Sequence, residues 1–240
     1  MTMKDKTVLV TGANRGIGRA LADEALARGA ARVYAGTRRP AAHPDDRVTP
    51  LDLDITSTAQ IQAAAGRIAS LDMLINNAGI ALPDDLTDPA VLERHLAVNL
   101  FGTGAVTRAF LPAVTRSRGA VVNILSVNSL APLPFIIPAY SVSKAAAFSM
   151  TQSLRAQVAG LGVRVHAVLP GPVDTDMTRG ADIPKASPES VARAVFDAID
   201  AGEEDIFPDP ASASVAALWR DGAAKVLERR FAQPAPVPAT

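Results

Sequence analysis

The amino-acid sequence predicts an α/β protein with a doubly wound parallel β-sheet. Short runs rich in β-branched residues alternate with longer stretches rich in alanine and leucine, a pattern typical of strands that alternate with helices. Several of the short runs are almost continuously apolar, as expected for parallel strands buried on both faces. With 240 residues, 48% of them hydrophobic, the chain is long enough for one large domain and short for two.

The alternation predicts seven strands, with helices between them and after the last one. The connections are short, and there is neither an internal repeat nor an interdomain linker. We therefore expect one domain over residues 1–232 and a Pro-rich C-terminal tail over 233–240. The expected strands cover residues 7–11, 32–36, 47–52, 73–76, 120–126, 164–169 and 205–207, and the expected helices cover 16–28, 57–69, 89–114, 139–161, 188–201 and 211–230.

The composition excludes several classes of function. The net charge is zero and no run of Lys or Arg stands out, so we expect neither nucleic acid nor an anionic membrane as a partner. Cysteine is absent, which removes disulfides, thiolate metal sites and cysteine nucleophiles, and the three histidines lack metal-ligand spacing, so no metal is expected. The N-terminus has no long apolar core of a signal peptide, and prolines interrupt the longest uncharged stretch, so we expect a soluble cytoplasmic protein.

A glycine-rich segment, Thr11-Gly12-Ala13-Asn14-Arg15-Gly16-Ile17-Gly18, joins the first expected strand to the first expected helix. Gly12 allows a sharp turn, Gly16 allows the backbone to approach a pyrophosphate, and Gly18 allows the helix to pack close to the sheet. Backbone N–H groups and the helix dipole would then bind the anion. The spacing differs from the commoner G-x-G-x-x-G, but its position predicts a dinucleotide site. The contacts expected from this segment are Gly12, Asn14, Arg15, Gly16, Ile17 and Gly18.

The end of the second expected strand indicates which dinucleotide binds. A site specific for NAD usually places a carboxylate there for the ribose hydroxyls. Here the strand ends in Gly36-Thr37-Arg38-Arg39, without a carboxylate. Arg38 can form charge-assisted hydrogen bonds to a 2′-phosphate, and Arg15 can reach the same group. The pattern therefore predicts NADP(H), with Thr37 and Arg38 among the contacts.

Tyr140 and Lys144 lie four residues apart at the start of an expected helix, so both lie on one helix face. A free tyrosine has a pKa of about 10, poorly matched to proton transfer at neutral pH, and a neighbouring cation lowers that value. Tyr140 would then be a general acid for a carbonyl oxygen or a general base for an alcohol. Alone, a Tyr-x-x-x-Lys pattern occurs by chance on many helices. Ser126 adds to it, because it ends an expected strand at the ligand-binding edge and can polarise a carbonyl.

These residues resemble the short-chain dehydrogenases/reductases, a family with the Rossmann fold, and the resemblance runs from Thr7 to about Trp219. The segment Asn76-Asn77-Ala78-Gly79 is similar to the Asn-Asn-Ala-Gly segment that ends a strand in this family. Asn99 is similar to the asparagine that supports a proton relay in the family. Asp54-Ile55 resembles the family's segment near the adenine of the cofactor. Residues 170–175 resemble the segment that contacts the nicotinamide end of the cofactor. Further cofactor contacts implied by the resemblance are Asp54, Ile55, Asn77, Ala78, Gly79, Tyr140, Lys144, Pro170, Gly171, Val173 and Thr175.

The resemblance also implies the roles of the four catalytic residues. Tyr140 would move the proton, while Lys144 would hold the nicotinamide ribose and lower the pKa of Tyr140. Asn99 would support a water-linked proton relay to Lys144, and Ser126 with Tyr140 would bind the substrate. The interval from Ser126 to Tyr140 is one residue longer than the family suggests, so Ser129 stays open as an alternative to Ser126.

The sequence thus predicts an NADP-dependent carbonyl reductase that acts on a small ketone or aldehyde. Two alternatives stay open: an NAD-dependent secondary-alcohol dehydrogenase and a non-catalytic NADP-sensing regulator. The resemblance implies a homo-oligomer, a tetramer or dimer, formed through the helices at 89–114 and 139–161. An apolar loop before the catalytic helix, which includes Leu133, Phe135, Ile136 and Ile137, can line the substrate pocket.

Overall fold

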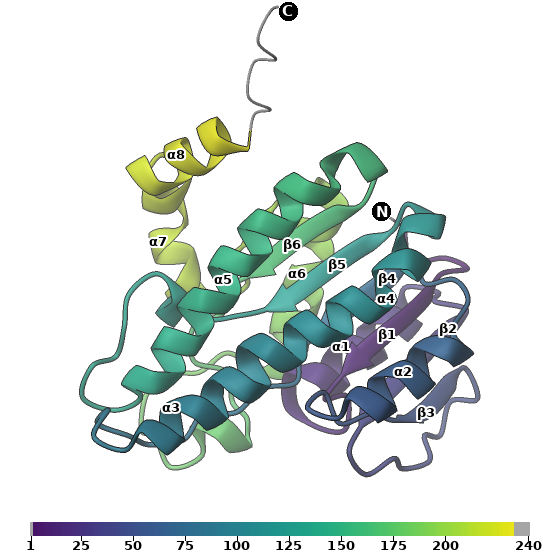
Figure 1. Cartoon of the computed structure of the whole chain (residues 1–240), viewed down its shortest axis with the longest axis horizontal. Coiled ribbons are helices and arrows are strands. Elements are labelled where there is room, and N and C mark those ends of the chain that lie inside the picture. The colour runs from purple at the N-terminus through teal and green to yellow at the C-terminus, as the bar shows by residue number, and fades with distance from the viewer. Residues whose placement is uncertain (1, 233–240) are drawn as a thin grey trace, which may run out of the picture.

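The expected doubly wound parallel sheet is confirmed. The structure, a computed structural model, describes residues 2–232, so the expected tail at 233–240 lies outside the described residues. All neighbouring strands are parallel, and their order across the sheet is β3-β2-β1-β4-β5-β6-β7 (Figure 1). The strands are β1 (Thr7–Thr11), β2 (Arg32–Thr37), β3 (Val48–Asp52), β4 (Met73–Asn76), β5 (Ala120–Ile124), β6 (Arg164–Val168) and β7 (Asp205–Ile206).

The strand order places a switch point between β1 and β4. The chain moves outward from β1 through β2 to β3, then returns so that β4 pairs with the other side of β1. At such a point the loops that leave the two strands diverge to opposite faces and open a crevice at the carboxyl ends of the strands. The glycine-rich loop after β1 and the Asn77 segment after β4 therefore border one crevice.

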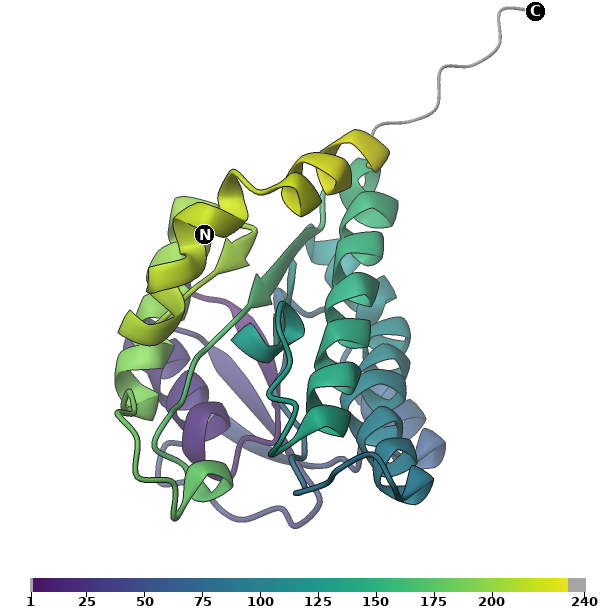
Figure 2. The ribbon, with the colours of Figure 1, turned by 90° about the vertical axis from the view of Figure 1, so that its left-hand side faces the viewer.

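Helices cover both faces of the sheet. Buried apolar residues of α1 and α6 pack on one face, and those of α2, α4 and α5 pack on the other (Figure 2). Within the described residues, no helix has the length and hydropathy needed to cross a bilayer. The helices are α1 (Gly16–Ala27), α2 (Thr58–Arg67), α3 (Pro89–Leu96), α4 (Thr103–Ser117), α5 (Pro138–Val158), α6 (Pro188–Ala201), α7 (Pro210–Arg220) and α8 (Ala223–Phe231).

The helix expected over 89–114 contains a π-helical turn. The helical path runs through α3, a π segment over Ala97–Gly102 and α4, so the position of the helix was predicted but its geometry was not. A side chain at Gly102 would come within 2.9 Å of the Ile55 carbonyl oxygen, so glycine lets this segment approach the loop after β3. Such turns are frequent at functional sites, and this one carries Asn99.

The single helix expected over 211–230 is wrong, because the chain forms two helices that break at Asp221 and Gly222. The break has a physical reason. Trp219 Nε1 donates to Asp205 Oδ2 at 2.8 Å, and Lys225 Nζ lies 2.7 Å from the same oxygen. Residues six apart in one continuous helix point about 120° away from each other, so they could not converge on one atom. The turn between α7 and α8 brings both donors to Asp205.

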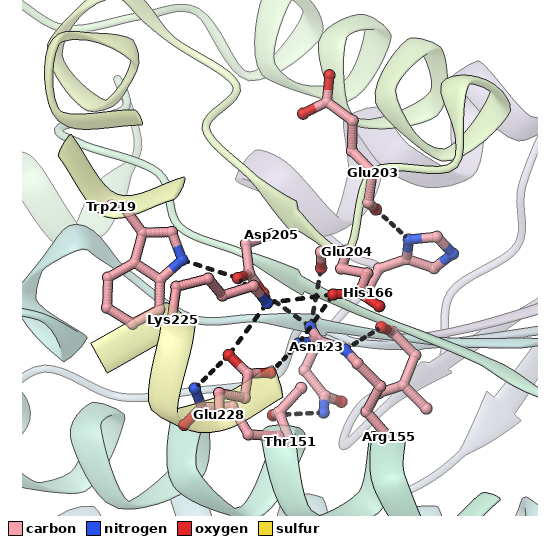
Figure 3. A network of polar contacts seen from close by, with 12 residues as sticks. Asn123, Thr151, Arg155, His166, Glu203, Glu204, Asp205, Trp219, Lys225 and Glu228 are labelled. Atoms are coloured by element: carbon pink, nitrogen blue, oxygen red, sulfur yellow. Dashed lines mark hydrogen bonds and ion pairs between the residues drawn. The ribbon is translucent and has the colours of Figure 1, made fainter. Parts of the chain in front are cut away.

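A buried network of charges joins the two C-terminal helices to the sheet (Figure 3). Asp205 on β7 pairs with Lys225 of α8 and with Arg155 of α5, at 2.7 Å in each case. Glu228 of α8 pairs with the same two cations. Burial alone would raise the pKa of Asp205, but Arg155 and Lys225 hold it below its ordinary value. The network therefore stabilises the folded chain as long as its carboxylates stay ionised.

We expect Lys225→Met to lower the free energy of unfolding by about 3–5 kcal/mol, because it leaves buried carboxylates short of a partner. The loss should be seen in urea denaturation at neutral pH. The pKa of Asp205 is depressed in the folded state, so this stabilisation is fully present above about pH 4 and fades as the pH falls further. Arg220→Met, which removes an exposed pair with Glu203, is the matched control and should cost less than about 1 kcal/mol. Equal losses in the two variants would contradict the prediction.

Candidate active site

The glycine-rich loop has the close packing that its sequence predicts. Gly12 and Gly16 have positive φ values of +68° and +52°, a conformation that favours glycine. A Cβ at Gly18 would lie 2.3 Å from the Gly12 carbonyl oxygen, so any other residue there would push α1 away from the loop. A Cβ at Gly16 would meet the Thr175 side chain at 3.0 Å. The loop thus touches the segment that follows β6.

Asn77 ties the end of β4 to the glycine-rich loop. Its Nδ2 donates to the carbonyl oxygens of Thr11 and Gly12 at 3.0 and 3.2 Å. The Thr11 hydroxyl accepts from the backbone N–H groups of Asn77 and Ala78, at 2.9 and 3.1 Å. These bonds cross the switch point and hold both walls of the crevice at a fixed separation.

The end of β2 has the features of a site for a phosphorylated ribose. Thr37 is buried, and its hydroxyl has no hydrogen-bond partner among the described residues. It faces a small cleft whose lining also includes Asn14 of the glycine-rich loop. Arg38, the next residue in the chain, is exposed and close enough to Asp54 to help lower the pKa of that carboxyl, which hydrogen bonds from Thr56 lower most. A buried hydroxyl without a partner and an exposed arginine one residue later are groups that could hold an NADP 2′-phosphate.

Arg15 points elsewhere than the sequence predicts. Its Nη1 lies 2.6 Å from Asp176 Oδ2, on the segment after β6, and both side chains are exposed. An exposed pair of this kind contributes little stability, so a phosphate could replace the carboxylate as the partner of Arg15. In this structure the pair joins the two segments that border the crevice.

The structure brings Ser126 and Tyr140 together. β5 ends at Ile124, so Ser126 lies just beyond the strand, where it caps a 3₁₀ turn by accepting from Asn128 N at 3.1 Å. The Ser126 hydroxyl is close enough to the Tyr140 phenol to act as its hydrogen-bond partner and to lower its pKa. The hydroxyl of Ser129, the alternative to Ser126, is buried and has no partner among the described residues. The contact with the phenol therefore favours Ser126.

The expected effect of Lys144 on Tyr140 is not found in this arrangement. Burial raises the pKa of Tyr140 to about 12, and the hydrogen bond with Ser126 offsets only part of that rise. Lys144 Nζ lies 5.7 Å from the centre of the Tyr140 ring and donates to the Ile124 carbonyl oxygen at 2.9 Å. Burial also lowers the pKa of Lys144 to about 8. At neutral pH Tyr140 is thus a protonated phenol, the form that can donate a proton.

Asn99 holds the backbone beside Lys144. Its Oδ1 accepts from Ile80 N and its Nδ2 donates to Ile80 O, both at 2.9 Å. The same Nδ2 donates to the Ser143 hydroxyl of α5 at 2.9 Å. A Cβ at Gly79 would lie 3.2 Å from Asn99 Oδ1 and 3.6 Å from Lys144 Nζ, so these three residues are neighbours.

The comparisons with known proteins agree with this geometry. The family model described as "short chain dehydrogenase" matches residues 6–185. The chain belongs to the short-chain dehydrogenase family. As a member of this family, it resembles a solved short chain dehydrogenase of Burkholderia cenocepacia in complex with NADP, with 36% identity and a TM-score of 0.88 over 98% of this chain and 100% of that one. Thermoplasma acidophilum aldohexose dehydrogenase shares 27% identity, with a TM-score of 0.76, over 85% of this chain and 92% of that one.

Curated relatives of this short-chain dehydrogenase differ in how much of their length it covers. Mouse estradiol 17-beta-dehydrogenase 2 is 34% identical over 76% of this chain, which spans only 52% of that protein. An uncharacterized oxidoreductase of Staphylococcus epidermidis is 32% identical over 82% of this chain and 92% of its own length. The family and the oxidoreductase class are therefore clear, whereas the mouse enzyme's substrate does not carry over.

The sequence did not predict the role of a buried aspartate, Asp209, which holds the 170–175 segment in place. Asp209 Oδ2 accepts from Gly171 N at 2.8 Å, while its Oδ1 accepts from Ser212 N and caps α7. A Cβ at Gly171 would come within 2.8 Å of the same carboxylate, so Gly171 must stay small. The run Asp-Pro-Ala-Ser at 209–212 is typical of a helix start, but only the fold shows that it also holds the 170–175 segment.

Proposed function

We propose that this chain is an NADP(H)-dependent carbonyl reductase that converts a small ketone or aldehyde into an alcohol. The observation that carries the proposal is the meeting of the Ser126 hydroxyl and the Tyr140 phenol beside Lys144, at the carboxyl end of β5. A reductase must protonate the oxygen that becomes the alcohol, and the neutral phenol is the form that can do so.

Each side chain would have its own role in the reduction. NADPH, when bound, would supply the hydride that a carbonyl carbon accepts. The Ser126 hydroxyl would donate a hydrogen bond to the carbonyl oxygen, and Tyr140 would deliver the proton as negative charge develops on that oxygen. Lys144 and Asn99, which border Gly79 at the switch point, would hold the nicotinamide ribose and pass a replacement proton from solvent.

The cofactor contacts of this proposal rest on the crevice around the glycine-rich loop. The unpaired hydroxyl of Thr37 and the guanidinium of Arg38 support a 2′-phosphate rather than a bare ribose hydroxyl. Among the structural relatives, the Burkholderia cenocepacia short chain dehydrogenase is in complex with NADP. The remaining contacts proposed are Gly12, Asn14, Arg15, Gly16, Ile17, Gly18, Asp54, Ile55, Asn77, Ala78, Gly79, Pro170, Gly171, Val173 and Thr175.

The loops around the site favour a substrate with an apolar part. Phe135 is 95% exposed and Ile136 is 63% exposed, both on the loop just before the catalytic helix. Met177 and Ile183 are 52% and 48% exposed on the segment after β6. Large apolar side chains exposed beside a polar catalytic centre are typical of a pocket that covers the apolar body of a ligand.

The proposal is tested by a panel of ketones, aldehydes and alcohols, assayed by nicotinamide absorbance with both cofactors. We expect carbonyl-dependent oxidation of NADPH, with apolar ketones giving higher kcat/KM than polar ones of similar size. Turnover of alcohols with NAD and not with NADP would favour an alcohol dehydrogenase instead. Tight NADPH binding without turnover of any compound would indicate a non-catalytic sensor.

We also propose that the enzyme works in the cytoplasm as a homo-oligomer. Phe101 in the π segment is 66% exposed and Val142 on α5 is 44% exposed, which supports association through the faces of α4 and α5.

A further inference from the structure

His95 is a fully buried polar side chain in contact with the catalytic tyrosine. It lies at the end of α3, one turn before Asn99, and has 0% exposure. Its ring meets the Tyr140 ring edge-on, with centres 6.3 Å apart and planes at 71°. Placing an imidazole here costs free energy unless both ring nitrogens are hydrogen-bonded.

Both nitrogens of His95 have partners, and the partners define its state. Nε2 accepts from Leu82 N at 3.0 Å, and Nδ1 donates to the Val91 carbonyl oxygen at 2.8 Å. The acceptor role of Nε2 leaves Nδ1 as the nitrogen that carries the hydrogen and donates it. His95 thus holds the backbone of the loop after β4, only two residues beyond the peptide group that Asn99 binds at Ile80.

The same loop supplies the cap of the catalytic helix. The side chain of Ile137, the residue before α5, is apolar and makes no capping hydrogen bond to the helix. Asp84 takes this role from the loop, with its two carboxylate oxygens 3.1 and 3.3 Å from Ala139 N. A carboxylate at a helix N-terminus satisfies a free N–H group and interacts favourably with the helix dipole. Ala139 directly precedes Tyr140, so the cap acts next to the catalytic residue.

These contacts form a closed ring of hydrogen bonds around Tyr140. His95 and Asn99 hold the loop over residues 80–82, Asp84 joins the loop to α5, and Asn99 joins α5 again through Ser143. The Ser143 hydroxyl in turn donates to the Tyr140 carbonyl oxygen at 2.7 Å. The 80–84 loop, the π segment that carries Asn99 and the start of α5 are therefore tied to one another beside Tyr140.

We infer that His95 and Asp84 are positioning residues, which hold the 80–84 loop against α5 and so fix Tyr140 for proton transfer. The inference rests on the proposed function, because it assigns a purpose to the placement of Tyr140. Neither residue needs to touch the substrate. Each acts through a backbone N–H group, Leu82 for His95 and Ala139 for Asp84.

Two pairs of variants test the inference. His95→Phe keeps a ring beside Tyr140 but loses the acceptor for Leu82 N, whereas His95→Gln can supply an acceptor oxygen at the same reach. Asp84→Ala removes the cap of α5, and Asp84→Asn keeps a cap oxygen. We expect His95→Phe and Asp84→Ala to lower kcat by about 10- to 100-fold, the effect of a small displacement of a catalytic group. His95→Gln and Asp84→Asn should recover most of the loss.

Two further readouts and one control variant separate positioning from general loss of structure. NADPH affinity, measured by nicotinamide fluorescence, should stay nearly unchanged in all four variants. The solvent deuterium isotope effect on kcat should rise in the two impaired variants, because proton transfer becomes slower relative to the other steps. His166→Gln alters another buried histidine, on β6, whose Nδ1 bonds to Glu203 O; it should lower the melting temperature without changing kcat or the isotope effect.

Hydrogen exchange tests the loop without any turnover. The amides of Leu82 and Ala139 should exchange slowly in the native protein and faster in His95→Phe and Asp84→Ala, respectively. If the native enzyme turns over no carbonyl compound, the proposed function fails while this measurement still reports on the loop. The inference is overturned if both impaired variants keep native kcat, if His95→Gln and Asp84→Asn lose as much as their partners, or if the loss lies entirely in NADPH affinity.

Discussion

Tyr140→Phe should lower kcat by about 10²- to 10⁴-fold, the range that general acid catalysis contributes in enzymes. The exchange removes one oxygen from a buried ring, so the shape of the site is kept. The lost hydrogen bond with Ser126 should cost only about 1 kcal/mol of stability. NADPH affinity should therefore remain close to that of the native protein, and the defect should appear in the chemical step. Single-turnover absorbance at saturating NADPH measures that step directly.

Tyr34→Phe provides the matched control for this experiment. Tyr34 is the other tyrosine of the sequence, and it lies half-buried on β2, which two strands separate from β5. The same loss of a phenolic oxygen there should leave kcat unchanged. Substantial turnover by Tyr140→Phe would remove Tyr140 from its proposed role. A loss that came with equally weakened NADPH binding would indicate a damaged site rather than a missing acid.

The fold was predictable because local signals and long-range packing agree over most of the chain. The apolar run before Gly12 forms a strand and the glycine-rich loop opens a helix, as the pattern indicates. The exceptions arise where a distant group decides the local geometry. The segment 211–230 has helical composition throughout, yet α7 and α8 turn at Gly222 because Trp219 and Lys225 both bind Asp205. Periodicity within the segment carries no information about that carboxylate.

The residues of the site could be predicted from the sequence. Several of the contacts that these residues make could not. Ser126 and Tyr140 meet as the sequence indicates, because strand ends and helix starts share one edge of the sheet. The direction of the Lys144 ammonium was not predictable, since its partner is the backbone oxygen at the end of β5. A helix cap that comes from a residue distant in the sequence was also not predicted. Asp84 lies 55 residues before Ala139, whose amide it binds. Nothing in the local sequence distinguishes it from its neighbour Asp85.

Arg38→Asp should change the preference between cofactors rather than the chemistry. A charge-assisted hydrogen bond is worth about 1.5–3 kcal/mol, so losing it should lower kcat/KM with NADPH by about 10- to 100-fold. The new carboxylate also repels a 2′-phosphate but can accept from the ribose hydroxyls of NADH, as acidic residues at this position do. We therefore expect kcat/KM to fall with NADPH and to rise with NADH. The ratio of the two values should change by more than either value does.

Arg39→Asp is the matched control, because it makes the same change at the next exposed residue. It should alter the ratio much less, because only Arg38 is proposed to contact the 2′-phosphate. Arg38→Asp also places a carboxylate near Asp54, whose pKa Arg38 helps to lower, so a melting curve must show that the β2 and β3 ends stay folded. Equal effects of Arg38→Asp on both cofactors would refute the assignment of a 2′-phosphate contact. Thr37 alone would then be too weak a basis for NADP preference, because an uncharged hydroxyl can bind either ribose.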